Sequence, residues 1–156
     1  FDQVTHWVRD KMTQLDESFH RTPRRLEVPV RYGGASGPDL ETVAVSKNIS
    51  PADVIRIHGG REYTVYMMGF TPGFPYMGTL DERLSMPRLE TPRTYVKAGS
   101  VAIADSQTGI YPLDSPGGWH LIGCTPLKLF DPTRDIPFLF SPGDLVKFIP
   151  VEDDHA

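Results

Sequence analysis

Apolar residues recur at two spacings along the chain, and each spacing predicts a different kind of element. Over residues 1–19 they return every three or four positions, which is the repeat of one helix face. This face comprises Phe1, Val4, Val8, Met12, Leu15 and Phe19. We expect an amphipathic helix that buries this face against this chain's own fold, against sequence upstream of Phe1, or against another subunit. Because the first residue is Phe rather than Met, we expect a processed or truncated form.

From residue 26 onward, apolar and polar residues alternate in short runs, which is the spacing of β-strands. Segments rich in Gly, Pro, Asp and Ser separate the runs and favour turns. In the final run Val146 and Phe148 share one face of the strand. About seven to nine such strands predict a closed antiparallel barrel or a sandwich. The runs cover residues 26–31, 63–68, 100–104, 119–124, 127–130 and 145–149, with another strand starting at 110–111.

Two short helices are predicted between the first two strands. Residues 40–47 follow Asp39, whose carboxylate can cap the start of a helix. A second helix begins at Pro51, with Ser50 in the N-cap position. His58 lies at the C-terminal edge of this helix, where the helix dipole favours a protonated imidazole.

The segment from Met68 to Thr79 is the most unusual stretch of the sequence. Its three glycines and two prolines are incompatible with a helix or a central strand. It nevertheless carries three aromatic side chains, Phe70, Phe74 and Tyr76, which is too many for a solvated linker. These features predict a stiff, ordered loop that either lines a site or an interface, or only covers the core.

Composition excludes several classes of protein. The chain has 156 residues, of which 39% are hydrophobic and 23% charged, so we expect one globular domain or one domain plus a fragment. The net charge is −4 and Lys and Arg do not cluster, so we expect no nucleic-acid partner. No apolar run approaches the roughly 20 residues of a membrane span. A single cysteine, Cys124, and the absence of a leader segment predict a cytoplasmic protein.

Motifs for self-sufficient catalysis are absent from the sequence. There is no Gly-x-x-x-x-Gly-Lys-Ser/Thr loop for a nucleotide and no Gly-x-Ser-x-Gly nucleophile turn. The histidines show no metal-ligand spacing with Cys124, so we predict no metal site. Cys124 lies in a predicted strand, which favours a buried structural thiol over a nucleophile.

Four polar residues remain as candidates for binding a ligand. Arg88 and Arg93 each follow a proline, which restricts where the guanidinium can lie. Arginines held in this way can present a fork to a carboxylate or phosphate, although exposed surface charge is the plainer alternative. Gln107 and His120 flank the turn-rich segment between them, and either could hydrogen-bond a ligand.

Six motifs, in the same order, resemble one known family. Together they cover residues 26–151 and are similar to the B-type subunit of 5-oxoprolinase, also named allophanate hydrolase subunit 1, a family that includes the sporulation kinase inhibitor KipI. The motifs are Tyr32-Gly-Gly-Ala-Ser-Gly-Pro-Asp-Leu40, Gly69-Phe-Thr-Pro-Gly-Phe-Pro-Tyr76, Pro92-Arg93 followed by Gly99-Ser-Val101, Gln107-Thr-Gly-Ile-Tyr-Pro112, Ser115-Pro-Gly-Gly-Trp119 and Pro142-Gly-Asp144.

The resemblance implies a mainly β fold, a cyclophilin-like antiparallel β-barrel with a few short helices, over residues 23–156. It also implies that residues 1–22 are the C-terminal helix of a small α/β domain that is mostly absent here. The implied function is that of one subunit, inactive alone, of an ATP-dependent amide-ring hydrolase that opens 5-oxo-L-proline to L-glutamate. ATP would be bound with the partner, which is the paralogous C-type subunit (allophanate hydrolase subunit 2 type). The further component would be the A-type subunit.

The resemblance leaves other functions open. The KipI branch implies a protein that binds and inhibits a sensor histidine kinase. The allophanate name implies a urea-derived substrate in place of oxoproline. A cyclophilin-like barrel alone suggests peptidyl-prolyl isomerase activity, although fold is weak support for function.

The resemblance also implies site residues. Arg88 and Arg93 would bind the carboxylate of oxoproline or a phosphate of ATP, and His58 and Gln107 would orient the lactam. The sequence departs from the family's pattern at Cys124 and His120, where we expect Arg at the first and commonly Arg or another polar residue at the second. We expect the two arginines, His58 and Gln107 to surround a single concavity. The implied catalytic residues are His58, Arg93 and Gln107, and the implied substrate-binding residues are Arg88, Phe70, Phe74, Tyr76, Tyr111, Trp119 and His120.

Overall fold

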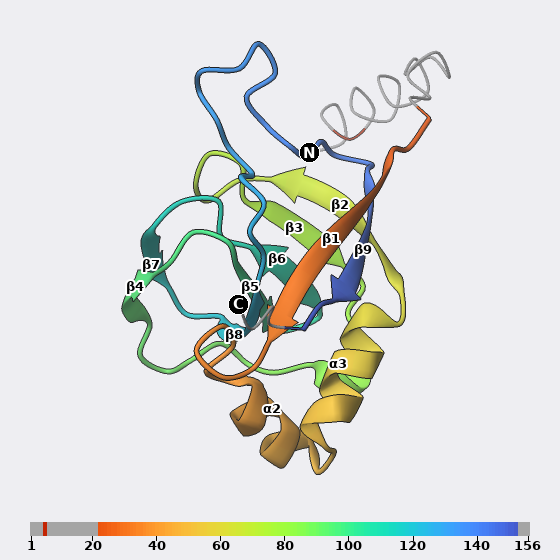
Figure 1. The fold of residues 1–156 in the computed structure, drawn as a ribbon, viewed down its shortest axis with the longest axis vertical. Helices are drawn as coiled ribbons and strands as arrows, with labels where there is room; N and C mark the ends of the chain where they lie inside the picture. Colours follow the sequence, from red (N-terminus) through yellow and green to blue (C-terminus); the bar gives the residue numbers. More distant parts are fainter. Residues whose placement is uncertain (1–4, 6–21, 153–156) are drawn as a thin grey trace.

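The computed structural model describes Thr5 and residues 22–152, and its centre is a closed seven-stranded barrel (Figure 1). The strand order is β1-β8-β5-β6-β3-β2-β9. All neighbouring pairs are antiparallel except β9 and β1, which run parallel and close the barrel. The prediction of a mainly β barrel is therefore confirmed. The strands are β1 (Arg25–Tyr32), β2 (Glu62–Met68), β3 (Pro75–Gly78), β5 (Ser100–Ala104), β6 (Gln107–Ile110), β8 (His120–Cys124) and β9 (Leu145–Pro150).

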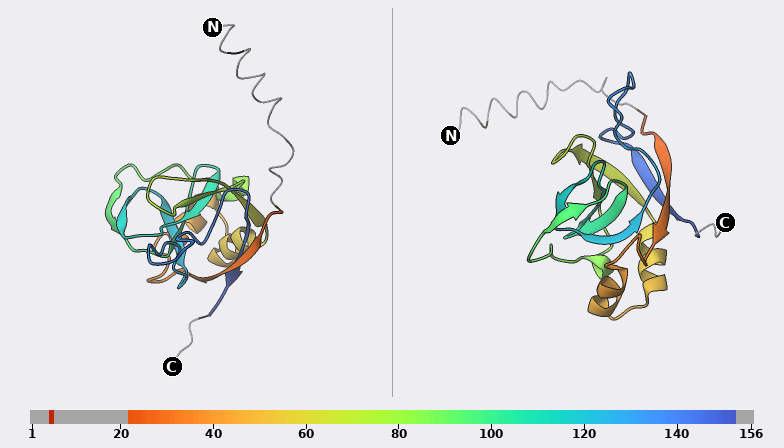
Figure 2. Two further views of the ribbon diagram at one scale, coloured as in Figure 1. Left: turned by 90° about the horizontal axis from the view of Figure 1, so that it is seen from above. Right: turned by 60° about the vertical axis from the view of Figure 1, so that its left-hand side comes forward.

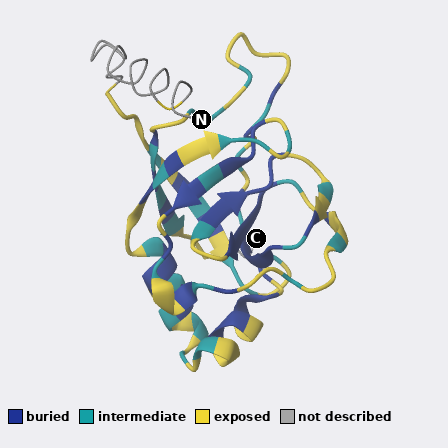
Figure 3. Ribbon diagram, turned by 180° about the vertical axis from the view of Figure 1, so that it is seen from behind, coloured by how far each residue is buried: buried dark blue, intermediate teal, exposed yellow. Residues whose placement is uncertain are grey.

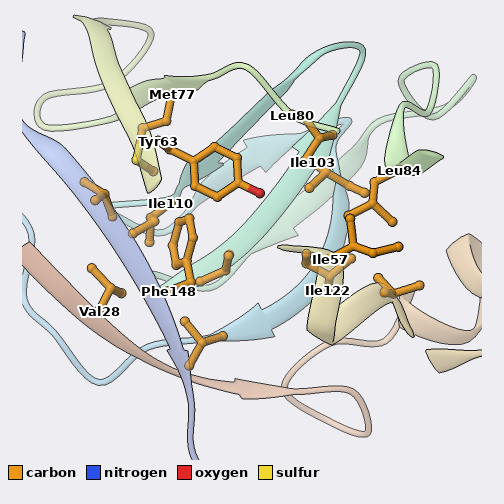
Figure 4. Close-up of a cluster of buried hydrophobic side chains, with 14 of the residues drawn as sticks. Val28, Ile57, Tyr63, Met77, Leu80, Leu84, Ile103, Ile110, Ile122 and Phe148 are labelled. Carbon is orange, nitrogen blue, oxygen red and sulfur yellow. The ribbon is translucent and has the colours of Figure 1, made fainter. Parts of the chain in front are cut away.

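Alternation along the strands fills the barrel with apolar side chains (Figure 4). On β9, Val146 and Phe148 point inward and are fully buried, as the alternation predicts. Burying such side chains stabilises a fold by about 1.5–3 kcal/mol each, and this supports a barrel that has no sheet edge. Further inward-facing residues are Val28, Val30, Tyr63, Met77, Ile103, Ile110 and Ile122.

The two predicted short helices are present and lie together at one end of the barrel (Figures 1 and 2). They are α2 (Leu40–Lys47) and α3 (Pro51–Gly59), and a 3-10 turn, η2 (Glu82–Leu84), lies against them. Ser50 caps α3 as predicted, since its hydroxyl accepts the Asp53 N–H at 3.0 Å. Asp39 precedes α2 but makes no capping bond, so that part of the prediction is wrong.

Three predictions about strands are wrong. The segment from Met68 to Thr79 is not all loop, because its second half forms the central strand β3, which Pro75 begins. Residues 127–130 form no strand, and only Phe130 makes an isolated bridge, to Phe138. The strand expected from 110 begins earlier, at Gln107, because the turn before it is tighter than expected.

A small second sheet was not expected from the sequence. It pairs β4 (Arg93–Val96) with β7 (Ser115–Gly117) and lies beside the barrel (Figure 1). Its prolines and glycines are typical of turns, which hides such short strands in the sequence. The strands β3, β5, β6 and β8 are mostly buried, whereas much of the loop backbone and the outward sides of the helices are exposed (Figure 3).

The expectations for the N-terminal segment, a helix and a domain boundary, fall on residues that the structure mostly does not describe. The helix predicted over 1–19, and with it the domain boundary after residue 22, lies outside the described residues apart from Thr5. Among the residues that are described, no helix has the length and apolar character needed to cross a membrane.

Candidate functional site

A cleft of about 260 Å³ opens on the outer face of the barrel, between the loop before β3 and the β4–β7 sheet. Its volume is near the lower end of the range for small-molecule sites, so a small ligand fits it better than a drug-sized one. Aromatic side chains form most of its walls. The lining residues are Phe70, Phe74, Tyr76, Arg88, Pro92, Tyr111, Pro116, Gly117, Gly118 and Trp119.

Phe74 is the centre of the aromatic cluster, and only 2% of its surface is exposed. Its ring meets Tyr111 and Trp119 edge-on, at centroid distances of 5.2 and 5.4 Å. Gly109 on β6 makes this position possible, because a Cβ there would lie 2.8 Å from the Phe74 ring. The floor of the cleft is therefore rigid and apolar.

The opposite wall depends on close packing between Tyr111 and Gly117. A Cβ at Gly117 would lie 2.1 Å from the Tyr111 hydroxyl, so only glycine fits this position of β7. Burial raises the pKa of Tyr111, although the backbone N–H of Trp119 opposes this by hydrogen bonding to the phenol oxygen. The phenol therefore stays protonated at neutral pH and can donate a hydrogen bond.

Phe70 forms the rim of the cleft on the loop before β3. It has a φ of 64°, an uncommon conformation for a bulky residue, and its side chain is 62% exposed. The loop is held closed by hydrogen bonds from the Gly69 N–H to the Phe74 carbonyl and from the Phe74 N–H to the Thr71 carbonyl. A large apolar ring is thus held out toward solvent by an ordered backbone.

Arg88 is the one charged residue among those that line the cleft. Its guanidinium carbon lies 5.9 Å from the centroid of the Trp119 ring, and its Nε lies 3.7 Å from a carboxylate oxygen of Asp105. Both Arg88 and Asp105 are more than half exposed, so this ion pair is weak and can be exchanged for a ligand anion. Arg88 therefore lines the cleft with its guanidinium partly open to solvent.

Arg93 is engaged within the protein. Its Nη2 donates to Asp39 at 2.6 Å and its Nη1 donates to the Trp119 carbonyl at 3.5 Å. The second carboxylate oxygen of Asp39 accepts the N–H of Leu121 at 2.6 Å, which explains why Asp39 does not cap α2. Arg93 does not line the cleft. Its bond to the Trp119 carbonyl instead positions the backbone of a residue that does line the cleft.

His58 lies in the barrel core, so the expectation that it faces the ligand concavity is wrong. It is fully buried, with Tyr32 Oη 2.7 Å from Nδ1 and Thr108 Oγ1 2.9 Å from Nε2. Thr108 donates its own proton to the Ala102 carbonyl, so it must accept from Nε2–H, which leaves Nδ1 to accept from Tyr32. Burial lowers the pKa of His58 to about 3, which reverses the protonated state expected at a helix terminus.

Neither Gln107 nor His120 lines the cleft. Gln107 pairs with Ala104 at the tight β5–β6 turn, on the outer face that also carries Gly109. His120 is 5% exposed and its Nε2 donates to the Pro87 carbonyl at 2.8 Å. That bond fixes the backbone just before Arg88.

The structure thus brings together one part of the predicted set and separates the rest. The aromatic residues and Arg88 share the cleft, whereas the expected grouping of His58, Gln107, Arg88 and Arg93 around one concavity is wrong. Sequence reasoning missed Pro92, Pro116 and the role of Asp39. Pro92 was interpreted only as a restraint on Arg93, and Pro116 only as part of a turn. The predicted residues that line the cleft are Phe70, Phe74, Tyr76, Arg88, Tyr111 and Trp119.

Comparison with known proteins gives the family. The profile described as carboxyltransferase domain, subdomain C and D, matches residues 1–140. The chain belongs to the carboxyltransferase subdomain C and D family. It is 48% identical to the 5-oxoprolinase B-type subunit of Bacillus subtilis (strain 168), over 100% of this chain and 66% of that protein. It is 52% identical to the 5-oxoprolinase B-type subunit of Escherichia coli O157:H7, over 88% of this chain and 63% of that protein.

A solved structure supports the same grouping for this carboxyltransferase-family chain. It is a conserved uncharacterized protein from Pyrococcus horikoshii, with 52% identity and a TM-score of 0.80. The match covers 83% of this chain and 60% of that one. The chain therefore spans about two thirds or less of the length of these relatives.

The described residues of this family member bear on metal binding, thiol chemistry and the kind of anion that fits the cleft. No group of three or more His, Cys, Asp or Glu side chains among them could hold a metal ion. Cys124 is half-buried, and burial raises the pKa of its thiol, so it is not an activated thiolate. The single guanidinium of the cleft matches one carboxylate better than the triphosphate of ATP, which needs several cations or a metal.

Proposed function

We propose that this chain is a non-autonomous subunit of an ATP-dependent amide-ring hydrolase that opens 5-oxo-L-proline to L-glutamate. The observation that carries the proposal is its 48–52% identity, over 88–100% of its length, to bacterial proteins named as the B-type subunit of 5-oxoprolinase. We place the complex in the cytoplasm, since the one cysteine of the chain is not part of a disulfide framework.

The cleft suits the oxoproline substrate. Arg88 provides a guanidinium fork for the carboxylate of the substrate, and charge-assisted bonds of this kind are about twice as strong as neutral ones. Phe74 and Trp119 pack against the flat lactam ring and exclude water from it. The protonated Tyr111 hydroxyl is a hydrogen-bond donor on the same wall.

The cleft does not supply a complete catalytic set. No carboxylate, imidazole or thiol is among its lining residues, so a general base must come from elsewhere. ATP likewise needs cations that the cleft lacks. We therefore assign ATP binding and activation of the ring to a shared site formed with the C-type subunit, and the A-type subunit would complete the enzyme.

An exposed apolar surface next to the cleft supports association with a partner. Phe70 and Met67 are exposed by 62% and 53%, and Ile136 and Phe138 on the loop before β9 by 76% and 40%. Phe70 and Phe138 border a shared groove of about 320 Å³. We name these four residues the apolar rim. Clusters of this kind are typical of protein contacts.

Reconstitution tests the proposal directly. The chain is produced alone, with the C-type subunit, and with both the C-type and the A-type subunits, and ATP-dependent formation of glutamate from 5-oxoproline is measured. We expect turnover only when the partner subunits are present. Turnover by the chain alone, or no turnover by the complete and correctly assembled set, would contradict the proposal.

The apolar rim also favours one alternative, a protein that binds and inhibits a sensor histidine kinase. The same exposed aromatic loop could engage the helical dimerisation domain of such a kinase. A pull-down with that domain discriminates the two functions, because micromolar binding together with inactive reconstitution supports inhibition. Absence of binding removes the alternative.

A further inference from the structure

The segment that carries Arg88 is irregular, yet hydrogen bonds hold its backbone on both sides of the arginine. Arg88 lies between η2 and β4, outside the helices and strands of the described chain. On one side, the Pro87 carbonyl accepts a bond from His120 Nε2 at 2.8 Å. On the other side, the Leu89 N–H donates to the Gly118 carbonyl at 2.8 Å. The backbone at Arg88 is therefore held against the residues that precede and begin β8.

Trp119 lies in sequence between the two residues that hold this segment, Gly118 and His120. Its ring is the one that the Arg88 guanidinium approaches, with 5.9 Å from the guanidinium carbon to the ring centroid. Arg88 and Trp119 both line the cleft. The side chain of Arg88 is more than half exposed, so few contacts fix its conformation. The reach of its guanidinium therefore depends on the position of the backbone from which it starts.

His120 supplies the only one of these bonds that uses a side chain. Proline has no N–H, so the backbone of Pro87 can be held only through its carbonyl. The neighbouring bonds join main-chain groups, and they include one from the Asp105 N–H to the Met86 carbonyl at 2.6 Å. The His120 bond is therefore the one that a substitution can remove while the main-chain bonds keep their donors and acceptors.

The second ring nitrogen of His120 distinguishes this residue from an ordinary core side chain. The side chain is 5% exposed, and Nδ1 is buried with no hydrogen-bond partner in the described part of the chain. A buried polar atom without a partner is unfavourable, and an apolar side chain at this position would avoid that cost. The bond from Nε2 to Pro87 is what the imidazole provides and an apolar residue could not.

We propose that His120 is a positioning residue for Arg88, through which it sets the preference of the cleft for a substrate that carries a carboxylate. The imidazole holds the Pro87 carbonyl, and this fixes the point from which the Arg88 guanidinium reaches the carboxylate. His120 is not among the residues that line the cleft, so it acts through Arg88. The inference rests on the proposed function, because it takes Arg88 as the ligand of the 5-oxoproline carboxylate.

The experiment measures kcat/KM for 5-oxoproline and for 2-pyrrolidone, which lacks the carboxylate, in the enzyme reconstituted with the C-type and A-type subunits. The ratio of the two values is the carboxylate preference. His120→Leu should lower this preference about tenfold, because displacing a positioned group by about 1 Å can cost up to about 100-fold.

Two further variants at the same position separate the hydrogen bond from the shape of the side chain. His120→Gln should recover most of the preference, since its amide nitrogen can take the place of Nε2. His120→Asn should not, because its side chain is one methylene shorter and does not reach the Pro87 carbonyl. The asparagine variant also tests the proposal if His120→Leu does not fold.

Tyr63→Phe is the matched control. The Tyr63 hydroxyl donates to the His58 carbonyl at 2.9 Å in the barrel core, so this variant also loses a buried bond from a side chain to a carbonyl. It should be less stable than the parent but keep the parent's carboxylate preference. In the Arg88→Ala background, His120→Leu should leave the preference unchanged, since the guanidinium that it positions is gone.

The outcomes distinguish failure of this inference from failure of the proposed function. A parent enzyme with no carboxylate preference would overturn the role of Arg88 and this inference with it. If Arg88→Ala loses the preference but His120→Leu and His120→Asn keep it, only the role of His120 is overturned. An equal loss in Tyr63→Phe, or a further loss when His120→Leu is added to Arg88→Ala, would also overturn it, because the effect would not act through Arg88.

Discussion

At the scale of single residues, His58 shows how burial selects one chemical form of a side chain. Its two ring nitrogens are each bonded, to Tyr32 and Thr108, and its ring lies 4.5 Å from that of Phe148. A charged imidazole in this environment would lack water and any carboxylate to pair with. The residue therefore joins α3 to β1 and β6 as a neutral structural group, and does not act as an acid or a base.

The buried His58 makes the free energy of unfolding depend on pH in a defined window. Its pKa is about 3 when folded, against an ordinary value of 6.5, so the unfolded state binds more protons between these values. Stability should therefore fall as pH drops below 6.5, by up to about 1.4 kcal/mol per unit. Urea unfolding between pH 7 and 5 measures this slope, and a flat profile for the parent chain would contradict the account.

Two features of that experiment assign the pH dependence of stability to His58: a variant that does not titrate, and the choice of pH range. His58→Gln should be less stable at pH 7 but should have lost most of the slope. Asp53, Asp81 and Asp131 also have lowered pKa values, because arginine or hydroxyl partners favour their charged forms. Their stabilising effect is lost only below their ordinary pKa of 3.8, outside the measured range.

The sequence identified the aromatic residues of the site better than the polar ones. Phe70, Phe74 and Tyr76 occur together in a Gly- and Pro-rich segment, a local signal that points to an ordered site. The roles of His58 and Arg93 depend on partners 50 and 54 residues distant, Thr108 and Asp39. No local pattern shows that such a side chain is already engaged.

At the scale of elements, the Asp39–Arg93 pair connects three parts of the chain that define the cleft. Asp39 precedes α2, Arg93 begins β4, and the Leu121 N–H on β8 bonds the same carboxylate. The side chains of Asp39 and Arg93 are 11% and 30% exposed, so the pair is shielded from much of the solvent. Its role is to position Trp119, whose carbonyl Arg93 contacts.

A double-mutant cycle tests this positioning role. Arg93→Ala leaves Asp39 without its cationic partner and should lower the free energy of unfolding by about 1–3 kcal/mol. Asp39→Asn should lower the free energy of unfolding much less in the Arg93→Ala background than in the parent chain, because the two residues stabilise the fold as a pair. Additive losses would contradict the pairing.

Catalytic measurements on the same variants distinguish positioning from substrate binding. In the reconstituted enzyme, Arg93→Lys should recover most of the activity lost in Arg93→Ala, since an ammonium can still reach Asp39. If Arg93 instead bound the substrate through its planar guanidinium, Arg93→Lys would not recover the lost activity.

Elements with a strong apolar period were predictable, and those built from turn residues were not. β1, β2, β5 and β9 alternate clearly, and the two helices carry Pro or acidic residues at their starts. The strand β3 begins at Pro75, and β7 contains Pro116 and Gly117, so each resembles a turn in sequence. Their pairing is fixed by the barrel and by packing against Phe74 and Tyr111, which are tertiary effects.

At the scale of the whole molecule, one side of the barrel combines a rigid cleft with the apolar rim. Phe74 and Tyr111 lie between the barrel core and this side, so the core supports the site directly. The helices α2 and α3 occupy one end of the barrel, away from the loop that carries Phe70 (Figure 1). This arrangement leaves the cleft open to a second protein.

Replacement of Phe70 tests whether the apolar rim is the partner surface. Phe70→Ser should weaken, by about tenfold or more, the affinity for the C-type subunit, because a large exposed anchor is removed. Val45→Ser is the matched control, since Val45 is 80% exposed but lies on α2. Calorimetric titration measures both variants, and equal affinity of the Phe70 variant and the parent chain would contradict the assignment.

The most direct test of the cleft as the oxoproline site compares two substrates and two enzymes. The kcat/KM for 5-oxoproline and for 2-pyrrolidone, which lacks the carboxylate, is measured in the reconstituted parent and in Arg88→Ala. The preference is the kcat/KM for 5-oxoproline divided by that for 2-pyrrolidone. If Arg88 binds the carboxylate, this ratio should be about 10- to 100-fold larger in the parent than in Arg88→Ala, as expected for the loss of one charge-assisted bond. The same preference in both enzymes would show that the carboxylate is bound elsewhere.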